Sequence, residues 1–338
     1  MSLPGISVLL PCRDAEAVLG ECIRSLREQT FEDFEVLAVD DGSRDGTREQ
    51  LERWAAEDRR VHVIEGAGRG LVAALNVAAS RGCASLLARM DADDVALPER
   101  FERQWGFLRD RSDVAACGTG VRYFPRERVG SGYARYEGWI NSLREPEELE
   151  RDLLVECPIA HPTLVVRARA FREAGGYRDR GWPEDYDLLL RLHRAGRRLA
   201  NVPRTLLRWR ITPGRLSMRS EAYSPAAFRR CKVHHLCRGY LPPGRPVVVW
   251  GAGRVGKPLA RTLVRHQVQP SAFVDLDPRK IGQEIYGAIV HSPSFLERAA
   301  EVRPFVIVAV GSPGAREEIR AWLDALGFEE PADYRALA

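Results

Sequence analysis

The sequence predicts an α/β protein with a mixed, mainly parallel sheet covered by helices on both faces, followed by a second, smaller α/β domain. Three observations predict this class. Short, continuous apolar runs typical of fully buried strands alternate with helical patterns from the first residues onward. The stretch LPPG (241–244) then interrupts the alternation. Beyond it the pattern restarts as strand, glycine turn and helix, so we expect domains at 1–240 and 241–338.

The first domain opens with ISVLLP (6–11), which has the composition of a strand buried on both faces. Apolar residues at helical spacing follow over 15–29, and Asp14 stands at the N-cap position of that helix. The next expected elements are strand 34–41, helix 48–57, strand 61–64, helix 71–80, strand 85–90, strand 161–166, a helix within 181–196 and a basic helix over 223–240. Between 122 and 155 glycines and prolines weaken the pattern, which predicts a variable segment with one or two helices.

Composition excludes several classes of protein. Hydrophobic residues make up 45% and charged residues 29%, as in an ordinary globular chain. The net charge of +4 is modest and no nucleic-acid-binding motif is present, so we expect no nucleic-acid partner. Apolar runs stay well below the roughly 18 residues that cross a bilayer. We therefore expect a cytoplasmic protein with at most peripheral contact with the inner face of a membrane.

Two acidic clusters follow predicted strands. Asp40 and Asp41 end the second strand, and Asp91, Asp93 and Asp94 come directly after strand 85–90. Ligands of parallel sheets bind at the carboxyl ends of the strands, so both clusters are candidate site residues. Carboxylate oxygens suit Mg²⁺ or Mn²⁺, although Asp94 stands equally well as a helix cap before LPERF.

Five ordered motifs resemble family 2 nucleotide-sugar glycosyltransferases, which have the GT-A fold. The resemblance covers roughly residues 5–220. Its motifs are ISVLLPCRDAEAVLGECIRSLREQTFEDFEVLAVDDGSRDGT (6–47), GRGLVAALNVAAS (68–80), RMDADDVALPERF (89–101), HPTLVVRARAFREAGGY (161–177) and WPEDYDLLLRL (182–192). The resemblance implies an inverting transfer from a nucleoside diphosphate sugar, with UDP favoured, to a glycan or lipid-linked acceptor.

The same resemblance assigns roles to single residues. It places Asp41 on the base of the donor, with Asp40 beside it. Asp93 becomes the principal ligand of Mn²⁺ or Mg²⁺, and Asp91 lies along the donor sugar and ribose. The other residues expected along the nucleotide are Pro11, Arg13, Asp14 and Arg69.

Asp185, next to Glu184, is the expected catalytic base. An inverting displacement needs one base opposite the leaving group to accept the acceptor proton, and adjacent carboxylates raise each other's proton affinity. The pair serves equally well as a cap of the helix that follows. Trp182 either stacks on an acceptor sugar or packs in the core, and the aromatic side chains of 122–155 leave the same two readings open.

The sequence departs from the family pattern at one position. Members of the family often carry a metal-binding histidine shortly after a Tyr/Trp-Arg pair, and Thr212 in WRITPG (209–214) stands there instead. A threonine hydroxyl is a poorer metal ligand than neutral imidazole. Metal binding is thus expected to rest on Asp93, the diphosphate and water.

The second domain carries GAGRVG (251–256), which follows a strand and precedes a helix, as the dinucleotide fingerprint requires. Gly251, Gly253 and Gly256 would admit a pyrophosphate, and Asp275 or Asp277 would hold ribose hydroxyls. The domain looks like the Rossmann-like domain of bacterial sugar-modifying enzymes. Further strands over 272–277 and 304–311 and a helix over 315–326 give it only half of a usual dinucleotide fold, so a bound dinucleotide or nucleotide and a purely structural role both remain open.

Three other functions fit the sequence less well. A sugar nucleotidylyltransferase would need a glycine-rich basic loop after its first strand, where this chain has PCRDAE (11–16). A bifunctional glycosyltransferase with an NAD(P)-dependent sugar-modifying domain would need hydride-transfer residues, and the sequence shows no Tyr-x-x-x-Lys pair. A catalytically inactive scaffold is disfavoured by the intact Asp41, Asp93 and Asp185.

Overall fold

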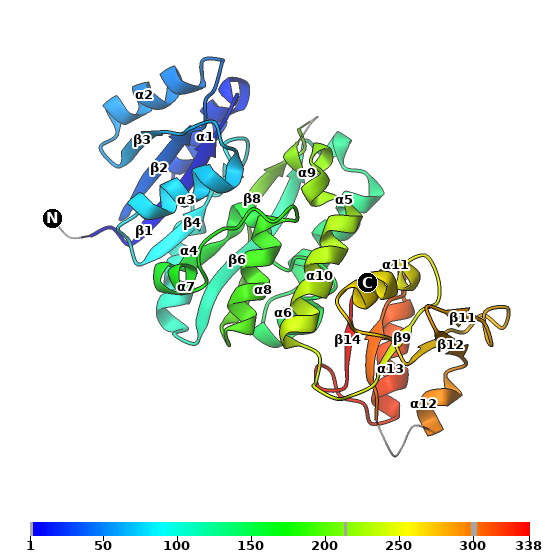
Figure 1. Cartoon of the computed structure of the whole chain (residues 1–338). Helices are drawn as coiled ribbons and strands as arrows, with labels where there is room; N and C mark the ends of the chain where they lie inside the picture. The colour runs from blue at the N-terminus through cyan, green and yellow to red at the C-terminus, as the bar shows by residue number, and fades with distance from the viewer. Residues whose placement is uncertain (1–2, 213–214, 299–302) are drawn as a thin grey trace. The chain divides into compact units, whose positions relative to one another are not determined.

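The computed structural model describes residues 3–212, 215–298 and 303–338. The chain forms two compact units (Figure 1). Unit 1 comprises residues 1–150, 158–180 and 184–219, and unit 2 comprises 151–157, 181–183 and 220–338. Unit 2 therefore takes in residues on both sides of the predicted boundary at 240/241, together with two short earlier segments.

Unit 1 is built on a mixed, mainly parallel sheet, which confirms the predicted fold class. Within the described residues, its eight strands lie in the order β3-β2-β1-β4-β7-β6-β8-β5. The first four run parallel, and β7 pairs antiparallel with both β4 and β6. The strands are β1 (Ile6–Cys12), β2 (Phe34–Asp40), β3 (Val61–Glu65), β4 (Leu86–Arg89), β5 (Val95–Ala96), β6 (Val114–Phe124), β7 (Val165–Arg167) and β8 (Arg198–Arg210).

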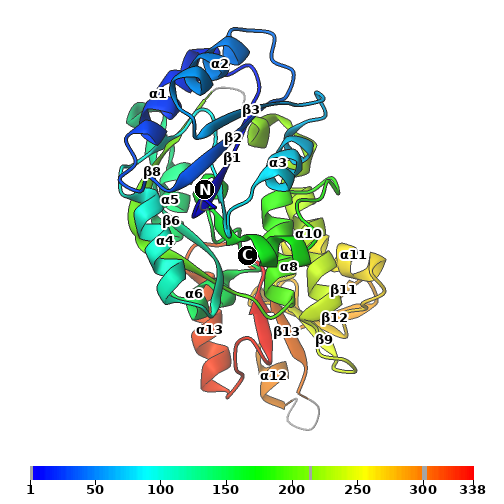
Figure 2. The same cartoon turned by 90° about the vertical axis from the view of Figure 1, so that its left-hand side faces the viewer.

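Helices cover both faces of this sheet. Figure 2 shows α1 and α2 on one side of β1–β3 and α3 on the other. This is the arrangement that right-handed crossovers give when the chain reverses its direction across the sheet after β3. The helices are α1 (Glu16–Arg27), α2 (Thr47–Glu57), α3 (Leu71–Arg81), α4 (Arg100–Asp110), α5 (Ser131–Ser142), α6 (Pro146–Asp152), α7 (Ala168–Glu173), α8 (Glu184–Arg194) and α9 (Leu216–Arg219), with short 3-10 turns at Arg126–Arg128 and His161–Thr163.

The central strands are buried because both of their faces are covered. Every residue of β2 is buried, and in β1 only Pro11 is partly exposed. These strands accordingly read as continuous apolar runs rather than as alternating ones. The same runs make them the easiest elements to predict from sequence.

Two long strands, β6 and β8, are not predicted from the sequence. The strand β6 contains two glycines, and β8 contains Pro203 and several arginines, so neither forms a continuous apolar run. Their pairing carries register shifts at Thr119 and Gly120, where the irregular backbone accommodates these residues. The predicted strand at 161–166 is also wrong in its first half, since His161–Thr163 forms a 3-10 turn before β7.

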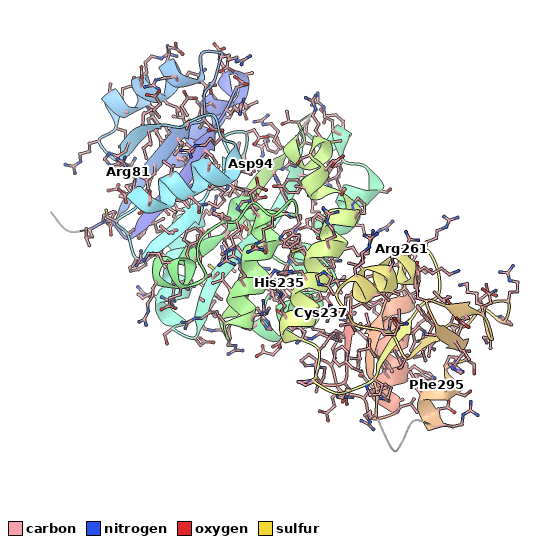
Figure 3. All side chains as sticks on the ribbon, in the orientation of Figure 1. Arg81, Asp94, His235, Cys237, Arg261 and Phe295 are labelled. Carbon is pink, nitrogen blue, oxygen red and sulfur yellow. The ribbon has the colours of Figure 1, made fainter. Side chains whose placement is uncertain are left out.

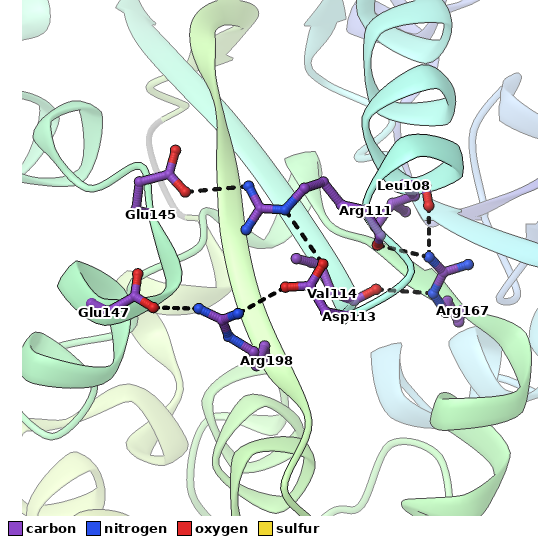
Figure 4. Close-up of polar contacts among 8 residues, drawn as sticks. All are labelled: Leu108, Arg111, Asp113, Val114, Glu145, Glu147, Arg167 and Arg198. Carbon is purple, nitrogen blue, oxygen red and sulfur yellow. Dashed lines mark hydrogen bonds and ion pairs between the residues drawn. The ribbon is translucent and has the colours of Figure 1, made fainter.

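An arginine network fixes the amino-terminal end of β6 (Figure 4). Arg167 donates hydrogen bonds to the carbonyl oxygens of Leu108, Arg111 and Val114 at 2.6, 3.1 and 2.9 Å. Arg198 and Arg111 both pair with Asp113, and they also reach Glu147 and Glu145 respectively. These contacts tie the end of α4, β7, β8 and the start of α6 together, away from the acidic clusters.

Unit 2 has its own sheet, in the order β11-β12-β10-β9-β13-β14 over the described residues. All neighbours pair in parallel except β11 and β12. The sequence predicts three of these strands and misses Glu284–Ile285, Ala288–His291 and Tyr334–Ala336, so the expectation of half a fold is wrong. The elements are α10 (Pro225–Gly239), β9 (Val247–Trp250), α11 (Gly256–Arg265), β10 (Ala272–Val274), β11 (Glu284–Ile285), β12 (Ala288–His291), α12 (Ser294–Arg298), β13 (Phe305–Val308), α13 (Ala315–Ala325) and β14 (Tyr334–Ala336), with a 3-10 turn at Glu221–Tyr223.

The segment 151–157 belongs to unit 2 through its side chains. Val155 packs in the hydrophobic core formed by β9, β10, β13 and α13. Asp152 accepts a hydrogen bond of 2.8 Å from the buried Arg320. In the part of the chain that the structure describes, no helix has the length and apolar composition of a membrane span.

Candidate active site

The first candidate residues lie where β1, β2 and β4 end. Parallel pairing aligns Cys12 with Asp40 and Leu9 with Arg89. The loops that follow these strands therefore leave the sheet at one edge. This edge brings Asp14, Asp41 and the 91–94 cluster into one region of unit 1.

The loops after β1 and β2 interlock through Asp14. Its backbone adopts the left-handed conformation, with φ +48°, and its carboxylate Oδ1 accepts a 2.8 Å hydrogen bond from the amide of Arg44. The Asp14 amide donates in turn to Oγ of Ser43 at 3.1 Å. The predicted N-cap role of Asp14 is wrong, since Ala15 is the N-cap of α1 and forms no side-chain cap. Asp14 instead joins the loop after β1 to the loop after β2. Arg13, the residue before it, is exposed.

Asp41 organises the segment before α3. Its buried carboxylate accepts hydrogen bonds from the amides of Arg69, at 3.1 Å, and Gly70, at 2.8 Å. The guanidinium of Arg13 lies 3.6 Å from Oδ2 of Asp41. Asp40 is also buried and accepts from the amide of Ser43 at 3.1 Å. Asp41 thus fixes the position of Arg69, whose side chain is exposed at this edge.

Carboxylate oxygens of Asp91, Asp93 and Asp94 all lie within 4.8 Å of one another. Arg89, which is buried beneath them, pairs with Asp91 at 2.5 Å. Asp94, which is labelled in Figure 3, is held by β8, because its Oδ1 accepts a 2.7 Å hydrogen bond from the amide of Arg210. Asp94 therefore does not cap α4, whose N-cap is Glu99. Asp93, the predicted principal metal ligand, therefore lies in a cluster of three carboxylates.

The three carboxyl groups differ in the direction of their pKa shifts. Burial tends to raise the pKa of Asp91, but the Arg89 guanidinium outweighs it and the pKa is lowered. Burial and the charge of Asp91 raise the pKa of Asp93, and they raise that of Asp94 well above its ordinary value. Oδ2 of Asp94 is buried and has no hydrogen-bond partner among the described residues. A divalent cation, which prefers carboxylate oxygens, fits this donor set.

Thr212 stands beside this cluster. Its hydroxyl donates a hydrogen bond of 3.1 Å to Oδ2 of Asp93. The position that carries a histidine in many family members is therefore next to the predicted metal ligand here as well. The next two residues of the WRITPG motif lie outside the described residues.

A buried polar network leads toward the predicted base. Nε2 of His161 lies 2.9 Å from the hydroxyl of Tyr177, and Nδ1 lies 3.5 Å from Oε1 of Glu184. Burial, with the nearby Arg89 cation, lowers the pKa of His161 to about 3, so the imidazole is neutral. Asn76 holds Tyr177 in place by hydrogen bonds to its backbone amide and carbonyl, at 3.0 and 2.9 Å.

The phenol of Tyr177 lies within the electrostatic influence of Asp91 and of the pair Glu184 and Asp185. Burial raises the pKa of its phenol, Arg89 counters this, and the charges of Glu184, Asp185 and Asp91 raise the pKa further. Glu184 is buried and Asp185 is partly exposed at the start of α8. His161, Tyr177 and Arg89 were not identified from the sequence, because a lone polar residue in an apolar run carries no signal of its partners.

The aromatic residues of the variable segment pack together. Tyr123 stacks on Trp209 at 5.0 Å and meets Tyr133 edge-on at 5.1 Å. The guanidinium of Arg215 lies 5.0 Å from the centre of the Trp209 ring. Trp182 belongs to unit 2, where it contacts His234 at 5.0 Å. These rings therefore make packing contacts, and stacking of a ring on an acceptor sugar stays a prediction.

The remaining candidates lie in unit 2. Gly251, Gly253 and Gly256 form the turn between β9 and α11, and Asp275 follows β10 directly. They form no part of the edge described above.

Residues 7–175 match the sequence model of glycosyl transferase family 2. The chain belongs to glycosyl transferase family 2. It is 31% identical over 266 residues to EpsE of Bacillus subtilis, named as a glycosyltransferase, and the match covers 77% of this chain and 90% of that protein. It is 29% identical over 236 residues to the O-antigen biosynthesis glycosyltransferase WbnJ of Escherichia coli, which covers 68% and 87% of the two chains.

Solved structures share the fold of this glycosyltransferase. Staphylococcus aureus TarS 1–349, in complex with UDP-GlcNAc, superposes with a TM-score of 0.57 over 77% of this chain and 72% of that one, at 17% identity. A Pyrobaculum calidifontis mannosyltransferase, in complex with GDP-Man and Mn²⁺, has a TM-score of 0.50 over 70% and 63%, at 19% identity. At these identities the likeness concerns the fold alone, and it confirms the GT-A-like class.

Proposed function

We propose that this family 2 glycosyltransferase transfers a sugar from a nucleoside diphosphate sugar, with UDP favoured, to a hydroxyl of a glycan or lipid-linked acceptor. The observation that carries the proposal is the edge at which β1, β2 and β4 end. It gathers Asp41 with the cluster Asp91, Asp93 and Asp94. The relatives EpsE and WbnJ, the latter named for O-antigen biosynthesis, support a bacterial polysaccharide as the product.

The nucleoside is assigned to the loops around Asp41. Its carboxylate retains acceptor capacity beyond the two amides that it holds, so it can also accept from a base N–H. Pro11, Arg13 and Asp14 line the same edge, with Asp40 supporting the loop beneath. Arg69 is exposed next to Asp41 and offers the planar guanidinium that suits a phosphate.

Asp93, with Asp91 and Asp94, would hold Mn²⁺ or Mg²⁺. A bound cation of this kind supplies charge that offsets the negative charge of a diphosphate leaving group. The unpartnered Oδ2 of Asp94 and the raised pKa values of Asp93 and Asp94 support this assignment. Arg89 pairs with the carboxylate of Asp91, and Arg210 donates its amide to the carboxylate of Asp94 and its Nε to the backbone carbonyl of Asp93.

Asp185 is assigned as the general base of an inverting displacement. The acceptor oxygen attacks the anomeric carbon, the bond to the diphosphate oxygen breaks, and the acceptor proton passes to the Asp185 carboxylate. Its position in the first turn of α8, next to Glu184, supports a location on the same site, because Glu184 lies 3.5 Å from His161 and His161 lies 2.9 Å from the hydroxyl of Tyr177. Glu184 lies deeper, beside His161, and is assigned a positioning role.

A donor screen tests the proposal. Purified protein is incubated with UDP-, GDP- and dTDP-sugars, with Mn²⁺ or with EDTA, and the release of nucleoside diphosphate is measured with oligosaccharide acceptors. The anomeric configuration of the product is read by NMR. A product that retains the donor configuration, or transfer that is indifferent to Asp185→Asn, contradicts the mechanism.

Unit 2 is assigned as a Rossmann-like domain similar to those of bacterial sugar-modifying enzymes. The five parallel strands in the order β12-β10-β9-β13-β14 and the glycine turn after β9 support this assignment. A hydride-transfer activity of unit 2 is the second candidate function, favoured only by that turn.

A further inference from the structure

A cavity of about 830 Å³ opens in unit 2 at the carboxyl ends of β9, β10 and β13. The central strand β9 is where the topology reverses, since β10 lies on one side of it and β13 on the other. Crevices at such switch points bind ligands in doubly wound sheets. The volume lies within the range of about 300–1,000 Å³ typical of small-molecule sites.

Two of the three glycines in the turn are required by packing. A Cβ on Gly251, whose φ is +119°, would lie 2.5 Å from the carbonyl oxygen of Ala309. A Cβ on Gly256 would lie 1.7 Å from the carbonyl oxygen of Gly251. Both glycines therefore allow β9, β13 and α11 to approach one another, with or without a ligand.

Gly253 is different, because nothing in the fold requires it. A Cβ there would have one atom within 4 Å among the described residues, the Nζ of Lys280 at 3.8 Å, and the backbone is not left-handed. Gly253 lines the cavity. A side chain at this position would point into space that the protein leaves open beneath a lysine.

The cavity wall carries two cations beside the glycine turn, Lys280 and Arg254, and also the acids Asp275, Asp277 and Glu318. Asp275 accepts a 3.0 Å hydrogen bond from Nζ of Lys280 and a 2.8 Å bond from the amide of Ala252, which holds the lysine over the turn. Arg254 also lines the cavity, and α11 begins at the turn, so its amide dipoles add positive potential. Lys280 is one of only three lysines in the sequence.

Other residues that line the cavity suit a nucleoside. Asp277, two residues beyond Asp275, offers carboxylate oxygens to ribose hydroxyls, although Arg279 pairs with it at 3.0 Å. Leu276 and Val255 line the cavity and are exposed by 70% and 37%. Such surfaces can pack against the face of a base.

We propose that the cavity of unit 2 binds a nucleoside diphosphate group, with the diphosphate over Gly253 beneath Lys280 and the ribose toward Asp277. The site is separate from the donor site of unit 1 and goes beyond the proposed transfer reaction. Free nucleoside diphosphates, sugar nucleotides and dinucleotides all carry this group.

Calorimetric titration of the full chain tests the proposal with ADP, UDP, UDP-glucose and NAD⁺ as separate probes. Lys280→Ala removes a charge-assisted bond to phosphate and should weaken at least one probe by about 10-fold or more. The matched control is Lys257→Ala, because Lys257 is exposed on α11 and does not line the cavity. The control should bind like the wild type, and the probe that responds most identifies the source of the diphosphate.

Gly253→Val is the second variant, and it should abolish the binding that Lys280→Ala weakens while leaving glycosyl transfer unchanged. Binding that all variants retain belongs to the donor site of unit 1. The proposal is overturned if every probe gives the same isotherm with wild type, Lys280→Ala and Lys257→Ala. Because Lys280→Ala removes no packing atoms from the sheet, this outcome remains decisive even if Gly253→Val fails to fold.

Discussion

The hydroxyl of Thr212 donates a 3.1 Å hydrogen bond to Oδ2 of Asp93. This contact places the residue that replaces the usual family histidine directly against the carboxylate assigned to the metal. The bond lowers the pKa of Asp93, although burial and the charge of Asp91 dominate and raise it overall. Thr212 thus supports the carboxylate, where an imidazole would itself be a ligand.

We expect Thr212→His to tighten Mn²⁺-dependent donor binding, because a neutral imidazole adds a nitrogen ligand beside Asp93. A gain of about tenfold in affinity, or ~1.4 kcal/mol, is the expected scale. Thr212→Val removes the hydroxyl without adding a ligand and is the matched control. Asp93→Ala should weaken donor binding chiefly when metal is present, and equal affinities for Asp93→Ala and wild type under that condition would sink the assignment.

Asp94→Asn should stabilise unit 1 and impair transfer. Because its pKa is raised in the folded state, ionised Asp94 costs folding free energy at any pH above its unfolded value, and the amide imitates the protonated form. The asparagine oxygen still accepts from the Arg210 amide. Thermal unfolding at pH 7 with EDTA should show a higher Tm, where about 1 kcal/mol corresponds to roughly 2–4 °C for a unit of this size. A lower Tm contradicts the charge assignment.

Asp185→Asn should lower kcat by about 10²- to 10⁴-fold, the usual cost of removing a general base. Donor affinity should stay close to that of the wild type, because the carboxylate acts on the acceptor proton. Asp179→Asn is the control, since Asp179 is an exposed acid six residues earlier. Near-normal turnover of Asp185→Asn would show that another group takes the proton.

His161 should make the stability of unit 1 depend on pH. Its folded pKa of about 3 lies below the ordinary value of 6.5, so the unfolded chain binds a proton that the folded chain rejects. The stabilisation is complete above pH 6.5 and is lost as the pH falls toward 3, at up to about 1.4 kcal/mol per pH unit. The neighbouring charged or titratable groups are Arg89, Asp91, Tyr177 and Glu184.

Denaturant unfolding of His161→Gln between pH 4 and 7 checks this dependence. The variant should lose part of the slope that the wild type shows, whereas His62→Gln should keep it, because the His62 side chain is 54% exposed. Parallel slopes for wild type and His161→Gln would mean that the imidazole does not titrate against folding.

The buried parallel strands and the strand-end location of the acidic clusters could be predicted from the sequence. β1, β2 and β4 are continuous apolar runs, and the carboxylates of 40–41 and 91–94 follow them directly. The partners of those carboxylates could not be predicted. Arg210, which holds Asp94, and Arg69, whose amide binds Asp41, come from distant positions that only the folded sheet brings together.

The extent of unit 2 also depends on contacts between positions that are distant in the sequence. The Pro-Pro-Gly stretch at 242–244 is a sound local signal, yet the compact unit also includes α10 and residues 151–157. Val155 joins the core of unit 2, and Lys232 on α10 donates a 3.2 Å hydrogen bond to the carbonyl of Leu337. A Pro-Gly stretch indicates where the chain turns, but it does not indicate which hydrophobic core a short segment far away in the sequence joins.

The last prediction concerns Arg320, which anchors that segment. The residue Arg320 is 3% exposed, and its guanidinium lies 2.8 Å from carboxylate oxygens of both Asp152 and Glu330. Burial tends to lower the pKa of Arg320, but the two carboxylates outweigh it and the pKa is raised. Removing the cation leaves two carboxylates without their shared counter-charge in the interior of unit 2.

Arg320→Met should therefore destabilise unit 2 by about 3–5 kcal/mol, the usual cost of breaking a buried ion pair from one side. Arg279→Met is the matched control, because Arg279 also pairs with an aspartate but its side chain is 90% exposed, and ion pairs in solvent contribute little to stability. Hydrogen exchange of the full chain should show lost protection in 151–157 and in α13 for Arg320→Met alone. Adding Asp152→Asn and Glu330→Gln to Arg320→Met should recover part of the loss, because the unpaired charges are then gone. Equal stability of the two single variants would show that 151–157 is held in unit 2 by Val155 and its apolar neighbours, with no net contribution from the ion pairs.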